Sequence, residues 1–220
     1  MSSQAEIEHF AKLKRMVRII TLLNAAAAAG LAPLGILKLH TFAYLSNVLA
    51  PVWEMPILDG KILKRKGGPF YPSLQNDLDR LVGMGVVTIT GLGHIKDDDK
   101  RWRLEGSYKL NPTFAETIFD KIASFDEERR LASFMQELAY ALSALSDSEL
   151  DSAMKEDATY SDPQISVGNV VDFDEWRKSN YSANAAIFFK KIIPGVGSAT
   201  PGEMIHLYVS HLHRRINGDR

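Results

Sequence analysis

The stretch PSLQNDLDRLVGMGVVTIT, residues 72–90, decides the fold. From Leu74 to Val82, apolar residues recur at i, i+4, i+7 and i+8, which places them on one face of a helix. Ser73 is a suitable N-cap for this helix, and the glycines at 83 and 85 end it. Residues 86–90 are rich in β-branched side chains, so a strand is expected directly after the helix.

The residues that follow predict a β-hairpin with a long, charged loop. Residues 101–104 and 108–110 alternate polar and apolar side chains, and residues 96–100 form the charged tip. Upstream, two helices are expected over residues 4–29 and 33–49, with an irregular segment at 52–69. The order of three helices and then a hairpin is typical of a winged-helix domain.

The first of these helices carries an apolar stripe. Its members recur at spacings of three and four, so this face is expected to be buried. They are Ile7, Phe10, Leu13, Val17, Ile20, Asn24 and Ala27.

The second half of the chain is expected to be mostly helical. We therefore predict a mainly α protein with a small β-hairpin, divided into a winged-helix-like domain at 1–111 and a helical C-terminal domain at 112–220. The break coincides with a change of charge, because residues 1–110 carry a net +5 and residues 111–220 a net −6. A second winged helix in the C-terminal half stays an open alternative, although that half has no obvious second hairpin.

Composition excludes several classes of protein. The 220 residues are 45% hydrophobic and 24% charged, as in ordinary globular domains. The chain has no cysteine, so disulfides, thiolate nucleophiles and iron–sulfur clusters are excluded. A net charge of −1 gives no strong overall attraction to nucleic acid or to an anionic membrane. The longest apolar stretch, residues 19–37, is interrupted by polar residues, glycine and proline, so we expect buried protein and a cytoplasmic location, with no membrane contact.

No catalytic constellation emerges from the motifs. His206 and His213 are spaced to share one helix face, but no carboxylate at a motif-like spacing accompanies them. His40 stands alone, as a buried histidine often does. We therefore expect no enzymatic activity, no catalytic residues, no cofactor and no metal.

Nucleic-acid binding is the usual alternative for a winged helix. The outward residues expected on the helix over 73–82 are Gln75, Asn76, Asp77, Asp79 and Arg80. Two aspartates would face the phosphates, which disfavours reading of the major groove. Seven basic residues could contact the DNA backbone or a protein partner. The alternative, that they are only solvated charges, stays open. They are Lys61, Lys64, Arg65, Lys66, Lys100, Arg101 and Arg103.

Four aromatic residues lie in or near predicted turns. They are Trp53, Phe70, Tyr71 and Trp102, and they suit two roles equally, as anchors of a protein interface or as part of the domain's core.

Residues 39–89, and above all GGPFYPSLQNDLDRL at 67–81, resemble the middle component of bacterial ABC-three-component systems. Those are defence operons related to Lamassu. The resemblance implies a small accessory subunit without catalysis of its own, which accompanies an SMC- or Rad50-like ATPase and a separate effector against phages or plasmids. It implies a role comparable to that of winged-helix accessory subunits such as MukE.

A second resemblance competes with the first. Residues 56–60, 68–69 and 71–74 are also similar to SocA-like (Panacea) domains. That resemblance implies an antitoxin or a proteolysis adaptor that binds a toxin. A winged-helix transcription regulator, which would recognise an operator, is the third alternative.

Overall fold

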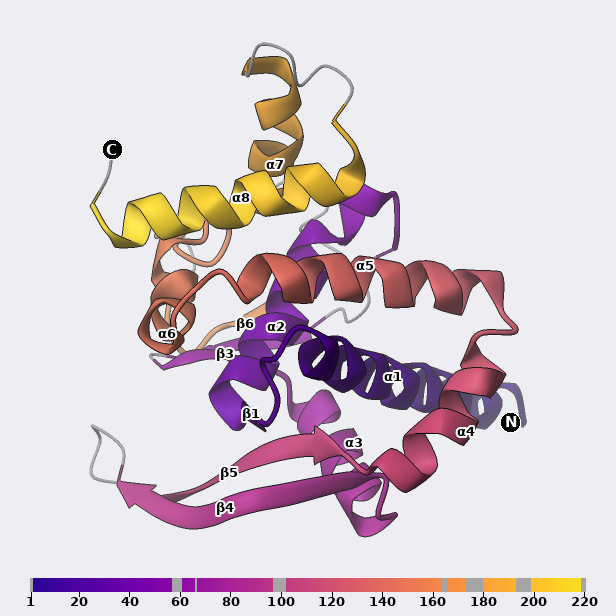
Figure 1. The fold of residues 1–220 in the computed structure, drawn as a ribbon. Helices are drawn as coiled ribbons and strands as arrows, with labels where there is room; N and C mark the ends of the chain where they lie inside the picture. Colours follow the sequence, from indigo (N-terminus) through magenta and orange to yellow (C-terminus); the bar gives the residue numbers. More distant parts are fainter. Residues whose placement is uncertain are drawn as a thin grey trace.

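The computed structural model of the chain describes residues 2–56, 61–65, 67–96, 102–163, 166–172, 180–192 and 199–218. The protein is mainly helical with two small antiparallel sheets, which confirms the predicted fold class at that level (Figure 1). Its elements, in chain order, are α1 (Ser2–Ala28), β1 (Leu34–Gly35), α2 (Ile36–Leu49), the 3-10 helix η1 (Ala50–Trp53), β2 (Lys61–Arg65), β3 (Gly68–Phe70), α3 (Pro72–Gly83), β4 (Val87–Lys96), β5 (Trp102–Leu110), α4 (Pro112–Ile122), α5 (Asp126–Leu142), α6 (Asp147–Glu156), β6 (Val170–Asp172), α7 (Tyr181–Ile192) and α8 (Pro201–Ile216).

The first sheet contains the predicted hairpin. Its strand order is β1-β5-β4, and β4 pairs with β5 from Val87 opposite Leu110 to Lys96 opposite Trp102. The strands are longer than predicted and contain a bulge between Thr90 and Gly93. The predicted tip beyond Lys96 lies outside the described residues.

The second sheet, with strand order β3-β2-β6, joins distant parts of the sequence. Ile62 of β2 lies opposite Val171 of β6, and Leu63 lies opposite Phe70 of β3. Among the described residues after 111, β6 is the only strand, and its partner belongs to the first half of the chain.

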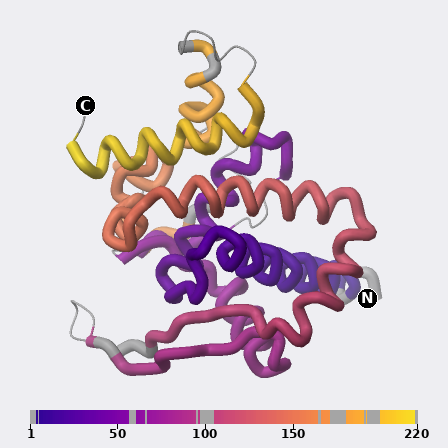
Figure 2. Tube along the Cα trace, in the orientation of Figure 1, coloured from indigo at the N-terminus to yellow at the C-terminus, as the bar shows by residue number. Residues whose placement is uncertain are grey.

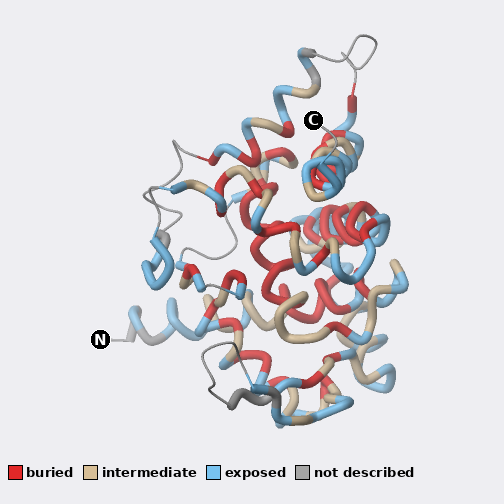
Figure 3. Tube along the Cα trace, turned by 90° about the vertical axis from the view of Figure 1, so that its left-hand side faces the viewer, coloured by how far each residue is buried: buried red, intermediate tan, exposed pale blue. Residues whose placement is uncertain are grey.

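The predicted apolar stripe of α1 is not the buried face at its N-terminal end. Ile7, Phe10 and Leu13 are 67%, 59% and 44% exposed, and the N-terminal turns lie at the edge of the molecule (Figure 3). The residues that enter the core recur on another face, from Ile19 through Leu22 and Leu23 to Ala26. The spacing correctly identified apolar residues on one side of the helix. Spacing alone does not say which part of that side other helices cover.

One core serves both halves of the chain. α1 packs beside α5, and α2 contacts α5, α6 and α7 (Figures 1 and 2). Every residue of α2 from Leu39 to Leu49 is buried, as expected of a helix that other elements surround. At Asn111, the predicted boundary, the side chain caps α4 and the backbone N–H donates to the Val86 carbonyl. Among the described helices, none combines the length and apolar character needed to cross a bilayer.

Candidate functional site

The segment at 67–81 that carries the family resemblance forms β3 and α3. At Gly68 the backbone has φ +134°, and a Cβ placed there would come within 2.6 Å of Leu37 Cδ1, so a side chain would be strained and crowded. Helix α3 begins at Pro72, with Tyr71 as N-cap and no side-chain cap. The prediction that Ser73 caps this helix is therefore wrong, because proline already occupies the first helical position.

Tyr71 belongs to the core. It is 1% exposed, and its hydroxyl accepts a hydrogen bond from Asn47 Nδ2 at 3.0 Å. Its backbone N–H donates to His40 Nδ1 at 3.3 Å, and the two rings are nearly parallel with centroids 6.2 Å apart. Tyr71 is therefore part of the core and is not exposed as an interface anchor.

Phe70, the neighbour of Tyr71, is the last residue of β3. It is half-buried, and its ring centroid lies 3.6 Å from the Arg65 guanidinium and 4.8 Å from the centroid of the His40 ring. Arg65 itself is exposed. We call Arg65, Gly67 and Phe70 the β2–β3 corner: Arg65 ends β2, Gly67 lies between the two strands, and Phe70 ends β3.

Lys64 is not a solvated charge. It is 8% exposed, its Nζ donates to the Asp162 carbonyl at 3.3 Å, and it lies 5.2 Å from the Tyr160 ring centroid. Burial lowers the pKa of Lys64. Alternation along β2 exposes Lys61 and Arg65 and turns Lys64 inward, so this lysine joins the two halves of the chain.

The remaining candidates are dispersed or undescribed. Lys66, Lys100 and Arg101 lie outside the described residues, and for Trp102 and Arg103 only the backbone, in β5, is described. Trp53 is half-buried in η1, with its ring 5.8 Å from that of Phe134. Among the candidates whose side chains the structure describes, only Arg65 and Phe70 come together at the surface.

The outward face of α3 is less acidic than predicted. Asp77 is 1% exposed, and its carboxylate accepts from Arg15 Nε at 2.8 Å and from Arg80 Nη1 at 3.1 Å. This prediction was wrong because a partner on α1 draws Asp77 inward. Asp79, which accepts from Gln75 Nε2 at 2.8 Å, stays exposed. The Arg80 guanidinium is thus held by a carboxylate of its own helix.

His40 makes the region behind the corner sensitive to pH. Its Nδ1 accepts from Tyr71, so Nε2 carries the proton and faces Gln75 Oε1 at 3.1 Å. Burial lowers the pKa of His40 to about 4, and the charges of Arg65 and Arg18 act in the same direction. His40 is consequently neutral at pH 7.

We expect the low pKa of His40 to reduce stability in mild acid. Its unfolded-state pKa is 6.5 and its folded-state pKa about 4, so protons favour the unfolded chain below pH 6.5. Between pH 7.5 and pH 5 the free energy of unfolding should fall by about 2 kcal/mol through this group. Urea unfolding of the protein and of a His40→Gln variant at both pH values measures the effect. An equal fall in both proteins would contradict this assignment.

A second polar cluster, which the sequence did not predict, lies around Asp157. Oδ1 accepts from the Tyr44 hydroxyl at 2.7 Å and from the backbone N–H groups of Thr159 and Tyr160 at 3.1 and 2.8 Å. Oδ2 accepts from the hydroxyls of Tyr208 and Ser182 at 2.7 and 2.8 Å. The carboxylate thereby connects α2, α7 and α8 to the end of α6.

The hydrogen bonds of this cluster serve to hold the helices together, and we call it the Asp157 joint. Burial, followed by the charge of Asp157, raises the pKa of both Tyr44 and Tyr208, so both hydroxyls stay protonated donors. Five donors occupy the lone pairs of the buried carboxylate, which leaves no position for a substrate proton. No sequence motif marks Asp157, because its donors come from four separate segments.

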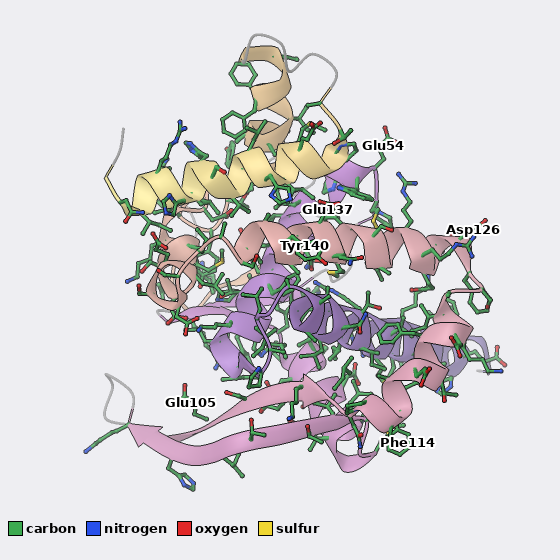
Figure 4. The ribbon with its side chains drawn as sticks, in the orientation of Figure 1. Glu54, Glu105, Phe114, Asp126, Glu137 and Tyr140 are labelled. Atoms are coloured by element: carbon green, nitrogen blue, oxygen red, sulfur yellow. The ribbon has the colours of Figure 1, made fainter. Side chains whose placement is uncertain are left out.

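The histidines of α8 face different helices. His206 Nε2 lies 3.3 Å from Glu137 Oε2 of α5, and Glu137 points toward α8 (Figure 4). His213 Nε2 lies 3.1 Å from Glu149 Oε1 of α6. Within the described part of the chain, no three His, Asp or Glu side chains are arranged to hold a metal ion.

No protein-family model matches the chain, and no curated protein matches it.

Proposed function

We propose that this chain is a non-catalytic accessory subunit of a cytoplasmic bacterial defence complex of the ABC-three-component, Lamassu-like type. In this role it bridges an SMC- or Rad50-like ATPase and an effector that acts against phages or plasmids. The observation that carries the proposal is the placement of the family-like segment 67–81, which forms a surface corner and a short helix.

The element order supports a winged-helix domain as the scaffold. α1, β1, α2, α3, β4 and β5 follow one another in the order helix, strand, helix, helix, strand, strand. The strand order β1-β5-β4 places the short first strand beside the last, with β4 and β5 as the wing. The β2–β3 hairpin is inserted between α2 and α3. Its second strand, β3, lies within the segment 67–81 that carries the family resemblance.

The charge of α3 favours a protein partner over DNA bases. A recognition helix needs free arginine, lysine or amide side chains. Here Arg80 is paired with Asp77, Gln75 donates to Asp79, and Asp79 adds an exposed negative charge. DNA contact, where it occurs, is expected along the backbone through Lys61 and Arg65 and to weaken strongly with salt.

The β2–β3 corner has the properties of a protein-binding anchor. Arginine and aromatic side chains contribute most to protein interfaces, and rigid groups lose little entropy on binding. Phe70 contacts both the Arg65 guanidinium and the neutral His40 ring. Gly68 fixes the turn behind it.

The proposal is tested by capture of the ATPase encoded beside this chain. An Arg65→Glu, Phe70→Ala variant should bind that ATPase at least tenfold more weakly, as expected for the loss of an anchor residue. Lys121→Glu, an exposed charge reversal on α4, is the matched control and should bind normally. Thermal unfolding of each variant verifies the fold.

Two outcomes would replace the proposal. Co-purification with a toxin alone, together with relief of its toxicity, would favour the SocA-like antitoxin. A footprint on a defined operator would favour a transcription regulator. Unchanged capture of the ATPase by the double variant would exclude the corner as the binding surface.

A further inference from the structure

Three side chains with metal-binding atoms meet where the C-terminal end of α8 lies beside α6 (Figure 1). Glu149 Oε1, on α6, lies 3.1 Å from His213 Nε2 and 2.7 Å from Asn217 Nδ2. The His213 and Asn217 atoms are 3.3 Å apart. These two residues are four positions apart at the end of α8, so their side chains share one side of that helix. One polar atom from each of the three side chains thus forms a compact triangle.

The size of the triangle matches the spacing of ligands around a divalent metal ion. Zinc binds nitrogen and oxygen ligands at about 2.0–2.2 Å, so two ligands at a right angle lie about 3 Å apart. The three distances correspond to ligand–metal–ligand angles of about 80–105°. An ion in contact with all three atoms lies to one side of their plane. The His213 side chain is 47% exposed, so water reaches the remaining coordination positions.

The carboxylate of Glu149 is already oriented toward α8. Its Oε2 accepts from the Ser146 backbone N–H at 2.8 Å and from the Ser146 hydroxyl at 2.7 Å, in the capping box of α6. A hydrogen-bonded second oxygen holds a metal-binding carboxylate in a fixed orientation. Hydrogen bonds from Asn217 and Ser146 also lower the pKa of Glu149 to about 2, so it is ionised at neutral pH.

The neighbouring positive charge of Arg215 is directed at another acid. Its Nε lies 3.0 Å from Glu156 Oε2. The charge of Glu149 is therefore balanced, among these contacts, by hydrogen-bond donors and by His213 when that ring is protonated.

We propose that Glu149, His213 and Asn217 form a binding site for a divalent first-row transition-metal ion such as Zn²⁺. Glu149 Oε1 and His213 Nε2 bind the ion as they stand. The Asn217 amide turns over, so that Oδ1 takes the place of Nδ2 and its hydrogen bond to Glu149 is exchanged for a bond to the ion. Imidazole suits transition metals, whereas Mg²⁺ and Ca²⁺ prefer ligand sets made of oxygen alone.

A bound ion would connect α6 to the end of α8. It stabilises the folded chain, because the unfolded chain does not hold these three groups together. The sequence predicted no metal, since two histidines without a third ligand gave no reason to expect one. The third and fourth groups could not be recognised, because Asn217 lies 68 residues from Glu149 in sequence.

Calorimetric titration with Zn²⁺ at pH 7.5 tests the site in the full chain without a polyhistidine tag. Concentrations up to about 1 mM are needed, because an open site with three protein ligands binds more weakly than a closed one with four. His213→Ala should weaken binding at least tenfold, since it removes one of the three ligands. His206→Ala is the matched control and should leave the affinity unchanged, because His206 pairs with Glu137 of α5. Circular dichroism verifies the fold of each variant.

Asn217→Asp separates a metal site from a contact made only of hydrogen bonds. Without metal, the new carboxylate faces that of Glu149, so the Tm of this variant should lie below that of the wild type. With Zn²⁺, the new carboxylate is an anionic ligand, so the ion should bind this variant more tightly than the wild type and raise its Tm by more. A contact made only of hydrogen bonds predicts the same loss of Tm with and without Zn²⁺.

Three results would overturn this inference. They are no Zn²⁺ binding up to about 1 mM, binding that His213→Ala leaves unchanged, and a loss of Tm in Asn217→Asp that Zn²⁺ does not reduce. None of these results depends on the ATPase or the effector, so the metal site and the bridging role are tested separately.

Discussion

Replacing Asp157 by alanine is expected to lower the free energy of unfolding by about 3–5 kcal/mol. The side chain is fully buried and accepts five hydrogen bonds. Alanine would leave five buried donors without this acceptor, and each unsatisfied group costs about 1–3 kcal/mol before relaxation. Urea unfolding monitored by circular dichroism measures the loss.

Two further variants are expected to lose less stability than Asp157→Ala. Tyr208→Phe removes one donor and keeps the ring, so it should cost about 1–2 kcal/mol. Asp151→Ala, an exposed aspartate on the neighbouring α6, should change stability by less than about 0.5 kcal/mol. If Asp157→Ala were as mild as Asp151→Ala, the carboxylate would not be the joint described here.

Leu78→Ala is expected to destabilise the protein by about 2–5 kcal/mol. Leu78 is fully buried in α3, which packs against α1 and β4. Alanine would leave a cavity between these elements, because packed helices and strands collapse only in part around a deleted side chain. The midpoint of urea unfolding should shift accordingly.

The control for Leu78→Ala is the same substitution at an exposed leucine. Leu92→Ala, in the exposed bulge of β4, should alter stability by less than about 0.5 kcal/mol. Leu78→Met, which nearly conserves volume, should cost less than about 1.5 kcal/mol. A loss below about 1 kcal/mol for Leu78→Ala would show that α3 is not packed as described.

The parts of the fold that depend on local pattern could be predicted. The 3.6-residue period of α3 and the change to β-branched residues at Val86 depend only on neighbours in sequence. Helix α3 forms where expected, and β4 begins at Val87 but extends further than expected, to Lys96. The pairing of β2 with β6 could not be predicted, because Ile62 and Val171 lie far apart in the chain and β6 has only three residues. The stripe of α1 was found but assigned to the wrong environment.

The candidate site could likewise be predicted only where it depends on residues that are neighbours in sequence. Consecutive residues of an extended chain point to opposite sides, which is consistent with a half-buried Phe70 beside a buried Tyr71. Only the position of His40 and Asn47 decides that Tyr71 is the buried one. The burial of Lys64 could not be predicted, because its acceptor, the Asp162 carbonyl, lies 98 residues away in sequence.

The bridging role is tested most directly by reconstitution of three components. A tagged SMC- or Rad50-like ATPase from the same operon is mixed with the effector, with and without this chain, and the retained effector is quantified. Retention of the effector only when this chain is present is the predicted result. Equal retention without this chain would contradict the proposed function.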